Sequence, residues 1–540
     1  MTGKGLSLVL STVLPLTVLA NDFSNVNANE SAQLWYEAGA SSIEDAQQLR
    51  ANKHRAKNVI LFVGDGMGIS TVTAARILEG QLRGESGEEN LLSFEKMPYL
   101  ALSKTYNTNQ QTPDSAGTMT AMMSGIKSKA GVISVDQSVT RGDCASSQNA
   151  HLKTFLEQAE QAGMSTGVVT TARLTHATPA ATYAHTPERN WEDDRDLPLE
   201  AKENGCKDIA RQLIEFPYGD GIEVAMGGGR RSFWPRNRDD LEDAGKTGER
   251  EDGRNLTEEW VAQYDNAAFV WNKDQFDAID TENIDHLLGL FNRSHMQYNY
   301  DLPNDNAGEP SIAEMTTKAI NILDNNRKGY FLMVESGRID HGHHAGNAFR
   351  ALDDTIAFSN AIKAAMENTD PRDTLIIVTA DHSHAFTIAG YPTRGNPILG
   401  NVLGNDSSGN PAEISLAKDN MPYTTVSYAN GRGFAMLGTG GDTHYAEAIN
   451  TGRTVDLSFV DTQDQGFHQE ALVPLSSETH SAEDVAIYSQ GPGAYLFHGV
   501  QEQNVIYHVM NTASRIEKRA EHGHDKERRM VRNEWRERED

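Results

Sequence analysis

Cysteine is almost missing from this chain, with only Cys144 and Cys206 among 540 residues. Two cysteines without a short Cys-x-x-Cys spacing exclude a disulfide-rich scaffold and argue against a redox or zinc pair. In an exported chain the two cysteines are expected to form one disulfide. Two separate buried thiols are the alternative that the sequence leaves open.

Long apolar runs are missing after the first twenty residues. Residues 6–19 are largely apolar, follow a single charge at Lys4 and lead to Ala20. This pattern predicts a secretory signal peptide over residues 1–20. A membrane anchor is the alternative, but about 20 apolar residues are needed to span a bilayer. We therefore expect an exported protein, periplasmic or extracellular, with no transmembrane segment.

Positive charge is also scarce, because 48 Lys and Arg face 76 Asp and Glu, for a net charge of −28. Such a chain repels nucleic acids and anionic membranes, so we expect no nucleic-acid recognition. It repels a phosphate ester as well, unless bound cations reverse the local field. Salt screens the self-repulsion, and a halophilic protein and a merely acidic exported enzyme are both left open.

Apolar, β-rich runs that end in a polar turn recur along the chain. They cover residues 59–63, 167–171, 330–334 and 375–379, and helical stretches at 69–80, 150–162 and 312–325 fall between them. Continuous apolar strands are typical of a parallel sheet covered on both faces. The sequence therefore predicts an α/β fold with a doubly wound, mostly parallel sheet, whose ligands bind beyond the carboxyl ends of the strands.

Two regions depart from this pattern. Residues 390–475 are rich in Gly, Asn, Asp and Ser, which predicts an inserted, crown-like subdomain within a main domain spanning residues 21–514. Residues 515–540 mix charges of both signs and are interpreted as a charged C-terminal tail. His522 and His524 in that tail are interpreted as surface residues.

The segment that contains Asp340 and His344 is the first candidate for chemistry. These two residues are four apart and share a face if the segment is helical. With one more histidine from elsewhere they suit a tetrahedral zinc site that keeps an open position. The alternative is a cluster of exposed histidines. His341 and His343 point elsewhere on a helix and are interpreted as structural or supporting residues.

A second candidate site combines Asp381 and His382 with Asp65. Asp381 and His382 follow a strand, where both side chains can turn inward, and a carboxylate with an imidazole suits zinc. Asp65 lies between Gly64 and Gly66, and such glycines let the backbone approach a metal closely. An ordinary aspartate in a strand-to-helix turn is the alternative for Asp65.

Ser115 follows Asp114 and precedes small residues that predict a helix start. A serine there directs its hydroxyl toward an anion held by the helix N–H groups and the positive dipole end. A simple capping serine is the alternative. Metals from the other segments favour the functional interpretation, because they can convert the hydroxyl into a nucleophilic alkoxide.

Six segments together resemble the alkaline phosphatase family: VGDGMG, PDSAGT, GVVTTARLTHATPAATYAHT, VESGRIDHGHH, TADHSH and SSETHSAEDV. They follow the family's order between about residues 63 and 485, and the resemblance is closest to the animal-type branch. It implies a homodimeric phosphate monoester hydrolase with an alkaline pH optimum, broad specificity and a covalent phosphoserine on Ser115. It also implies paired Cys144 and Cys206.

Carried onto this sequence, the resemblance implies two zinc ions and one magnesium ion. The implied zinc ligands are Asp340, His344 and His480 for the first ion, and Asp65, Asp381 and His382 for the second. The implied magnesium ligands are the oxygens of Asp65, Thr178 and Glu335, as a hard cation prefers. Arg189 matches the arginine that clamps phosphate, and Asp114 and His176 are implied as supporting residues.

His176 stands where some bacterial relatives carry Asp. The imidazole is a softer ligand, so the sequence leaves open whether magnesium or zinc occupies this site, or whether a water lies between His176 and the ion.

The sequence leaves two other functions as alternatives. A phosphodiesterase or phosphomutase of the same superfamily would use a similar metal site. A non-enzymatic exported metal-binding protein would leave the convergence of Ser115 and Arg189 unexplained.

Overall fold

The computed structural model describes residues 30–433, 435–436 and 455–523. The predicted signal peptide over residues 1–20 and the tail from His524 onward lie outside the described residues. The described chain divides into two units, with the boundary after Gln47. Nearly all of helix α1 (Ala32–Gln48) belongs to the first unit, and none of its residues is buried.

A ten-stranded sheet forms the centre of the second unit, in the order β19-β2-β18-β8-β1-β7-β3-β4-β6-β5. Its strands are β1 (Asn58–Gly64), β2 (Tyr99–Lys104), β3 (Ser165–Arg173), β4 (Val224–Gly228), β5 (Ala267–Val270), β6 (His286–Leu290), β7 (Tyr330–Ser336), β8 (Thr374–Ala380), β18 (Val485–Gln490) and β19 (Val500–Glu502). All neighbours from β8 to β5 are parallel, whereas β18 runs antiparallel to both β8 and β2. The four predicted strands lie inside β1, β3, β7 and β8, and the predicted mostly parallel sheet is confirmed.

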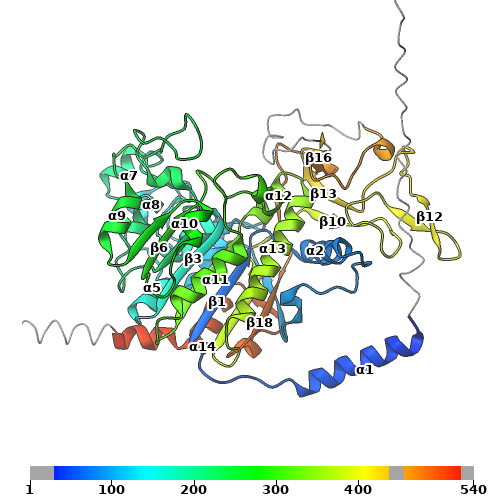
Figure 1. The fold of residues 1–540 in the computed structure, drawn as a ribbon, viewed down its shortest axis with the longest axis horizontal. Helices are drawn as coiled ribbons and strands as arrows, with labels where there is room; N and C mark the ends of the chain where they lie inside the picture. Colours follow the sequence, from blue (N-terminus) through cyan, green and yellow to red (C-terminus); the bar gives the residue numbers. More distant parts are fainter. Residues whose placement is uncertain (1–29, 434, 437–454, 524–540) are drawn as a thin grey trace, which may run out of the picture. The chain divides into compact units, whose positions relative to one another are not determined.

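Helices cover both faces of this sheet, because alternate residues of its buried strands point to opposite sides. In β1, Val59, Leu61 and Val63 belong to one apolar core, and Ile60 and Phe62 to the other. The first core is covered by α3 (Ser115–Ser124), α5 (Phe155–Gln161), α6 (Ala177–Tyr183), α8 (Ile209–Ile214), α9 (Leu256–Gln263) and α14 (Val505–Ser514). The second is covered by α2 (Ile69–Leu82), α10 (Lys273–Asp277), α11 (Ile312–Leu323), α12 (Arg338–His344) and α13 (Ala348–Glu367). In Figure 1, α11 and α13 cross in front of the strands.

Short elements complete the second unit. The helical ones are α4 (Cys144–Ser147), α7 (Leu199–Glu203), η2 (Ser93–Lys96), η3 (Arg230–Phe233), η4 (Asn299–Asn304), η6 (Leu457–Phe459) and η7 (Ala494–Leu496). The strands outside the main sheet are β9 (Ser383–His384), β10 (Phe386–Ile388), β11 (Leu403–Asn405), β12 (Pro411–Ile414), β13 (Val426–Gly431), β14 (Ala435–Met436), β15 (Phe467–His468), β16 (Ala471–Pro474) and β17 (His480–Ser481). They pair in small two- and three-stranded sheets, and several lie in the region predicted to be the inserted subdomain.

The helix expected over residues 150–162 is shorter in the structure. It begins at Phe155, because Thr154 is its N-cap. The Thr154 hydroxyl accepts from the Glu157 N–H, and the Glu157 carboxylate accepts from the Thr154 N–H. His151, inside the expected range, instead pairs in a β-bridge with Val135.

Two findings concern the cysteines and the C-terminal segment. Cys144 and Cys206 form a disulfide with an S–S distance of 2.10 Å, so the single-bridge alternative is confirmed. Residues 516–523 are helical; Ile516 is buried in the first core, and Ala520 is also buried. The packed core therefore continues past residue 514, where the main domain was predicted to end.

Candidate metal centre

The candidate site lies at the carboxyl ends of three adjacent strands. β1 lies between β7 and β8, with Val63 in register with Glu335. Asp65 follows β1 and Asp381 follows β8, so parallel pairing brings their carboxylates to one edge of the sheet. Gly66 has a φ of +70°, and a Cβ there would lie 2.3 Å from the His384 ring. The backbone of this turn therefore passes so close to the His384 ring that a side chain at residue 66 would clash.

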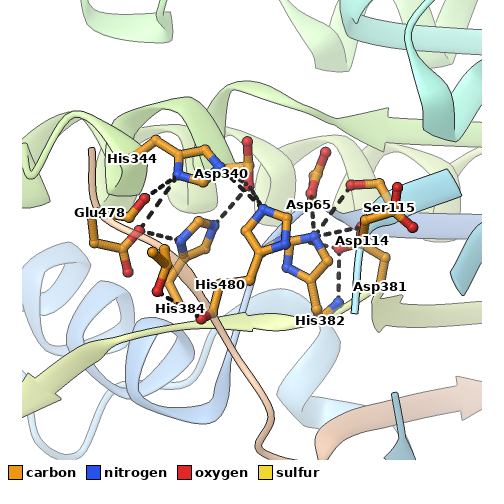
Figure 2. Close-up of polar contacts among 12 residues, drawn as sticks. Asp65, Asp114, Ser115, Asp340, His344, Asp381, His382, His384, Glu478 and His480 are labelled. Atoms are coloured by element: carbon orange, nitrogen blue, oxygen red, sulfur yellow. Dashed lines mark hydrogen bonds and ion pairs between the residues drawn. The ribbon is translucent and has the colours of Figure 1, made fainter. Parts of the chain in front are cut away.

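Asp340, His344 and His480 form the first group of side chains. Asp340 and His344 share one face of α12, and His480 arrives on β17 (Figure 2). The Nε2 atoms of His344 and His480 lie 3.4 Å and 3.3 Å from Asp340 Oδ1 and 3.1 Å from each other. Although burial opposes it, the surrounding imidazoles hold the pKa of Asp340 well below its usual range.

The hydrogen bonds of this group show that it suits a cation. His344 Nδ1 faces the Glu478 carbonyl at 2.6 Å, and His480 Nδ1 faces the Pro113 carbonyl at 2.8 Å. Carbonyl oxygens only accept, so in a neutral imidazole the proton is on Nδ1 and the lone pair on Nε2. Two lone pairs and a carboxylate oxygen then converge on one point. Such a donor set fits zinc.

Asp65, Asp381 and His382 form the second group. His382 Nε2 lies 3.1 Å from Asp381 Oδ2 and 3.5 Å from Asp65 Oδ1. All three side chains are buried, and one atom of each lies within 4.8 Å of the others. Burial first, then the charges of neighbouring carboxylates, raise the pKa of Asp65 well above its usual range. A bound cation would relieve this repulsion. The His480 ring stacks on the His382 ring at 3.6 Å, which joins the two groups.

The third group combines Asp65 and Glu335 with His176, whose ligand atoms also lie within 4.8 Å of one another. Thr178, implied as a ligand, is buried on α6 close to His176 in the chain. Several buried atoms here have no hydrogen-bond partner among the described residues: both carboxylate oxygens of Asp65, Glu335 Oε1, Thr178 Oγ1 and His176 Nδ1. Unpaired buried oxygens are costly, and this mainly oxygen set fits a hard cation such as magnesium.

Ser115 is the first residue of α3 and lies beside the second group. Its Oγ is 3.2 Å from His382 Nε2, and its side chain is almost fully buried. Asp114 is the N-cap: its Oδ1 accepts from the Gly117 N–H at 3.1 Å. The capping role weighed for Ser115 therefore belongs to Asp114, and the Ser115 hydroxyl is left facing the predicted metal ligands (Figure 2).

Arg189 reaches the same point from a loop distant in sequence. Its Nη1 donates to Asp114 Oδ2 at 3.1 Å, and its Nη2 lies 3.3 Å from His176 Nε2. Asp114 Oδ2 also accepts from the Gly131 N–H at 2.8 Å. Asp114 thus fixes both the helix that carries Ser115 and the guanidinium that would hold an anion beside it.

Comparison with known proteins identifies the family. A model of the family described as alkaline phosphatase matches residues 56–516. The chain belongs to the alkaline phosphatase family. It is 44% identical to the tissue-nonspecific alkaline phosphatase isozyme of Gallus gallus, over 90% of this chain and 89% of that protein. The alkaline phosphatase of Gadus morhua is also 44% identical, over 90% of this chain and 97% of that protein.

Solved alkaline phosphatases share the fold. The enzyme from the Antarctic bacterium TAB5 has a TM-score of 0.56 and 21% identity, covering 86% of this chain and 99% of its own. The Thermus thermophilus enzyme has a TM-score of 0.59 and 22% identity, covering 89% and 97%. The predicted fold class, the resemblance to animal-type members and the assignment as a phosphate monoester hydrolase are confirmed.

Two residues that the sequence patterns did not single out, His384 and Glu478, complete the first group. His384 Nε2 lies 2.8 Å from Asp340 Oδ1, and His384 Nδ1 lies 2.6 Å from Glu478 Oε2. Although burial lowers it, the Glu478 and Asp340 carboxylates raise the pKa of His384 to about 10. The signal that could have found His384 is its spacing of two from His382, which places both on one side of an extended segment.

The two histidines set aside in the sequence have other contacts. His343 is buried, with Nε2 2.9 Å from Thr71 Oγ1 and Nδ1 2.9 Å from the Tyr428 hydroxyl. It therefore links α12 to α2 and to β13. His341 Nδ1 lies 3.1 Å from Arg338 Nη1.

Across the described ranges, no helix combines the length and hydropathy needed to cross a membrane. The disulfide is compatible with export.

Proposed function

We propose that this chain hydrolyses phosphate monoesters through a transient phosphoserine on Ser115. The observation that supports this most is the convergence of Ser115 Oγ, His382 Nε2 and the Asp114–Arg189 pair at the N-terminal end of α3. A helix N-terminus and a guanidinium both favour a phosphate dianion there. Binding of metal alone would not call for this arrangement.

In the same proposal, three metal ions complete the site. The first zinc ion would be held by Asp340, His344 and His480, the second zinc ion by Asp65, Asp381 and His382, and magnesium by Asp65, Thr178 and Glu335. The softer His176, beside Asp65 and Glu335, would tune the choice between magnesium and zinc. When bound, these ions would supply Lewis-acid charge and lower the pKa of hydroxyl groups and water nearby.

The protein's own residues would act in sequence. The two Nη atoms of Arg189 hold two phosphate oxygens, and Asp114 keeps the guanidinium in place. Ser115 Oγ attacks phosphorus in line, and the ester bond breaks to release the alcohol. Water then cleaves the phosphoserine and releases inorganic phosphate. These residues would contact only the phosphoryl group of the substrate, so broad specificity for the alcohol is expected.

We further propose export, with residues 1–20 as the signal, and a homodimer like that implied by the resemblance. Sedimentation of the purified mature protein would measure the second, and N-terminal sequencing of the exported protein the first. A mature N-terminus at Met1 would contradict cleavage of the signal.

The experiment that tests the mechanism traps the intermediate. The holoenzyme is mixed with a ³²P-labelled monoester, quenched in acid and digested, and the label is located by mass spectrometry. We expect label on Ser115, two zinc ions and one magnesium ion per chain, and slower cleavage of a diester. Turnover of the monoester without label on any residue would favour direct attack by water.

A further inference from the structure

A cavity of about 410 Å³ opens at the opposite edge of the central sheet, near the amino ends of β3, β4 and β6. Its lining includes Ser165, Asp220, Glu223, Tyr264, Asp265 and Asp285, and no lysine or arginine is among its described lining residues. The metal centre lies at the carboxyl ends of the strands, so this cavity is a separate feature of the fold.

Two buried glutamates meet beside this cavity. Glu160, on α5, is 1% exposed, and Glu223, just before β4, is 7% exposed. Thr166 holds one oxygen of each: its Oγ1 donates to Glu160 Oε1 at 2.6 Å, and its N–H donates to Glu223 Oε2 at 2.6 Å. The two carboxyl groups are thereby held next to each other.

One oxygen of this pair has no donor. Glu160 Oε2 is buried and has no hydrogen-bond partner among the described residues. A Cβ on Gly219 would come within 2.2 Å of it, so the main chain that leads into Asp220 passes directly over this oxygen. The next residue, Asp220, and Glu223 both line the cavity beside this oxygen, and a buried oxygen without a donor calls for a positive partner.

The other titratable groups around the pair supply no positive charge to it. The Tyr264 and His286 rings stack at 3.8 Å, and His286 Nδ1 faces the Ile222 carbonyl at 3.0 Å. Burial lowers the pKa of His286, so it is neutral near pH 7. Lys328, on the loop before β7, lies against Gly163 and does not line the cavity.

The protonation of the pair is therefore linked to pH. Burial, followed by the charge of Glu223, raises the pKa of Glu160 well above its usual range, and burial raises the pKa of Glu223 to about 8. Near neutral pH the pair therefore holds protons that two free carboxyl groups would have lost. Loss of these protons at alkaline pH leaves adjacent negative charges that face the acidic cavity without a counter-charge.

We propose that at alkaline pH a hard cation of the calcium class binds in this cavity to Glu160, Glu223 and Asp220, in place of the protons that the two glutamates hold. Calcium accepts six to eight oxygen ligands from carboxylates, carbonyls and water, and the cavity has room for water beside the carboxylates. These protons leave to solvent as the cation binds. The site is independent of the proposed phosphate chemistry, because it shares no residue with the metal centre.

Calcium binding to the holoenzyme tests this proposal. Zinc and magnesium are kept saturating, and calcium is titrated calorimetrically at about pH 9 and about pH 6, on either side of the Glu223 pKa of about 8. We expect the parent to bind one calcium ion per chain more than Glu160→Gln or Glu223→Gln at the higher pH. At the lower pH this extra binding weakens by about tenfold or more, since a proton competes for the same oxygens. Calcium exchange at the metal centre occurs in all variants and cancels in the difference.

Glu258→Gln is the matched control, because Glu258 is an exposed surface carboxylate paired with Arg238. It removes one negative charge but should keep the parent's extra calcium ion. Thermal unfolding gives a second readout. At about pH 9 without calcium, Glu160→Gln should melt above the parent, because the repulsion is gone, and calcium should raise the melting temperature of the parent alone. Equal calcium stoichiometry in the parent, Glu160→Gln and Glu223→Gln would overturn the proposal, as would a parent whose melting temperature calcium leaves unchanged relative to Glu160→Gln.

Discussion

Carboxylates are buried at both edges of the central sheet, but the side chains that contact them differ. At the carboxyl edge, Asp340 contacts His344, His384 and His480, and its pKa is held well below the usual range. At the amino edge, Glu160 meets Glu223, and the pKa values of both are raised. Burial opposes ionisation at both edges, so the neighbours decide the outcome.

This difference indicates which cation suits each edge. Imidazole nitrogens beside carboxylates form the mixed ligand set that zinc prefers. These imidazoles also lower the concentration of negative charge at the site. A set of oxygens alone leaves a proton or a hard cation as the counter-charge. In our proposals, the carboxyl edge therefore holds the metal ions used for chemistry, whereas the amino edge holds a cation for its charge alone.

The largest expected effect is at the carboxyl edge, on Ser115. Ser115→Ala should lose about 10³-fold or more in kcat, because the nucleophile is removed while water near the ligands remains. Its metal content should match the parent, since Ser115 is not assigned as a metal ligand. Steady-state kinetics with p-nitrophenyl phosphate and mass spectrometry of bound metals measure both. A variant that turns over at the parent rate would end the covalent mechanism.

Removal of the bound metal ions is expected to have the next largest effect, and this effect concerns the carboxyl edge. His480 lies 136 residues along the chain from His344, so an ion shared by them ties distant segments together. Exhaustive chelation should lower activity by about 100-fold or more and also lower the melting temperature, because the ions bind only the folded state. Readded zinc and magnesium should restore both. Full activity of protein shown to be free of zinc would contradict this expectation.

A smaller effect is expected for Arg189→Ala. The guanidinium contacts Asp114 and His176 and is assigned to phosphate. The variant should lose about 10- to 100-fold in kcat/KM, and phosphate should inhibit it more weakly, with metal content unchanged. Arg189→Lys is the matched control that keeps the charge without the planar fork. Loss of a zinc ion from Arg189→Ala would show that the arginine supports the metal ligands instead.

The smallest expected effect is that of salt. The net charge of −28 predicts repulsion among the acidic groups of the protein. In 1 M sodium chloride the Debye length is about 3 Å, so this repulsion is largely screened. The melting temperature at alkaline pH should rise by a few degrees between low salt and about 1 M. Glu160→Gln should gain less, because one source of repulsion is absent. A melting temperature that stays flat or falls would favour the merely acidic enzyme over adaptation to salt.

Local sequence patterns were enough to predict most of the carboxyl edge. Asp65 and Asp381 each follow an apolar run, and such runs end where parallel strands present their ligands. Asp340 and His344 share a helix face through their spacing alone, and Ser115 stands where small residues begin a helix. The signals were local because each ligand is tied to the end of one strand or to one turn of a helix. For His480 and Arg189, no local pattern pointed to the site, and only the family resemblance did.

Other features depended on the tertiary structure. The contact between His384 and Glu478 joins residues 94 positions apart, and Glu160 meets Glu223 only because both bind Thr166 on β3. Ile516 is buried although its sequence neighbours are charged. Hydrophobic periodicity and turn residues predict the secondary structure of a segment, because both act over only a few residues. Which segments then meet depends on strand order and helix packing, and those arise from long-range contacts that a local pattern does not encode.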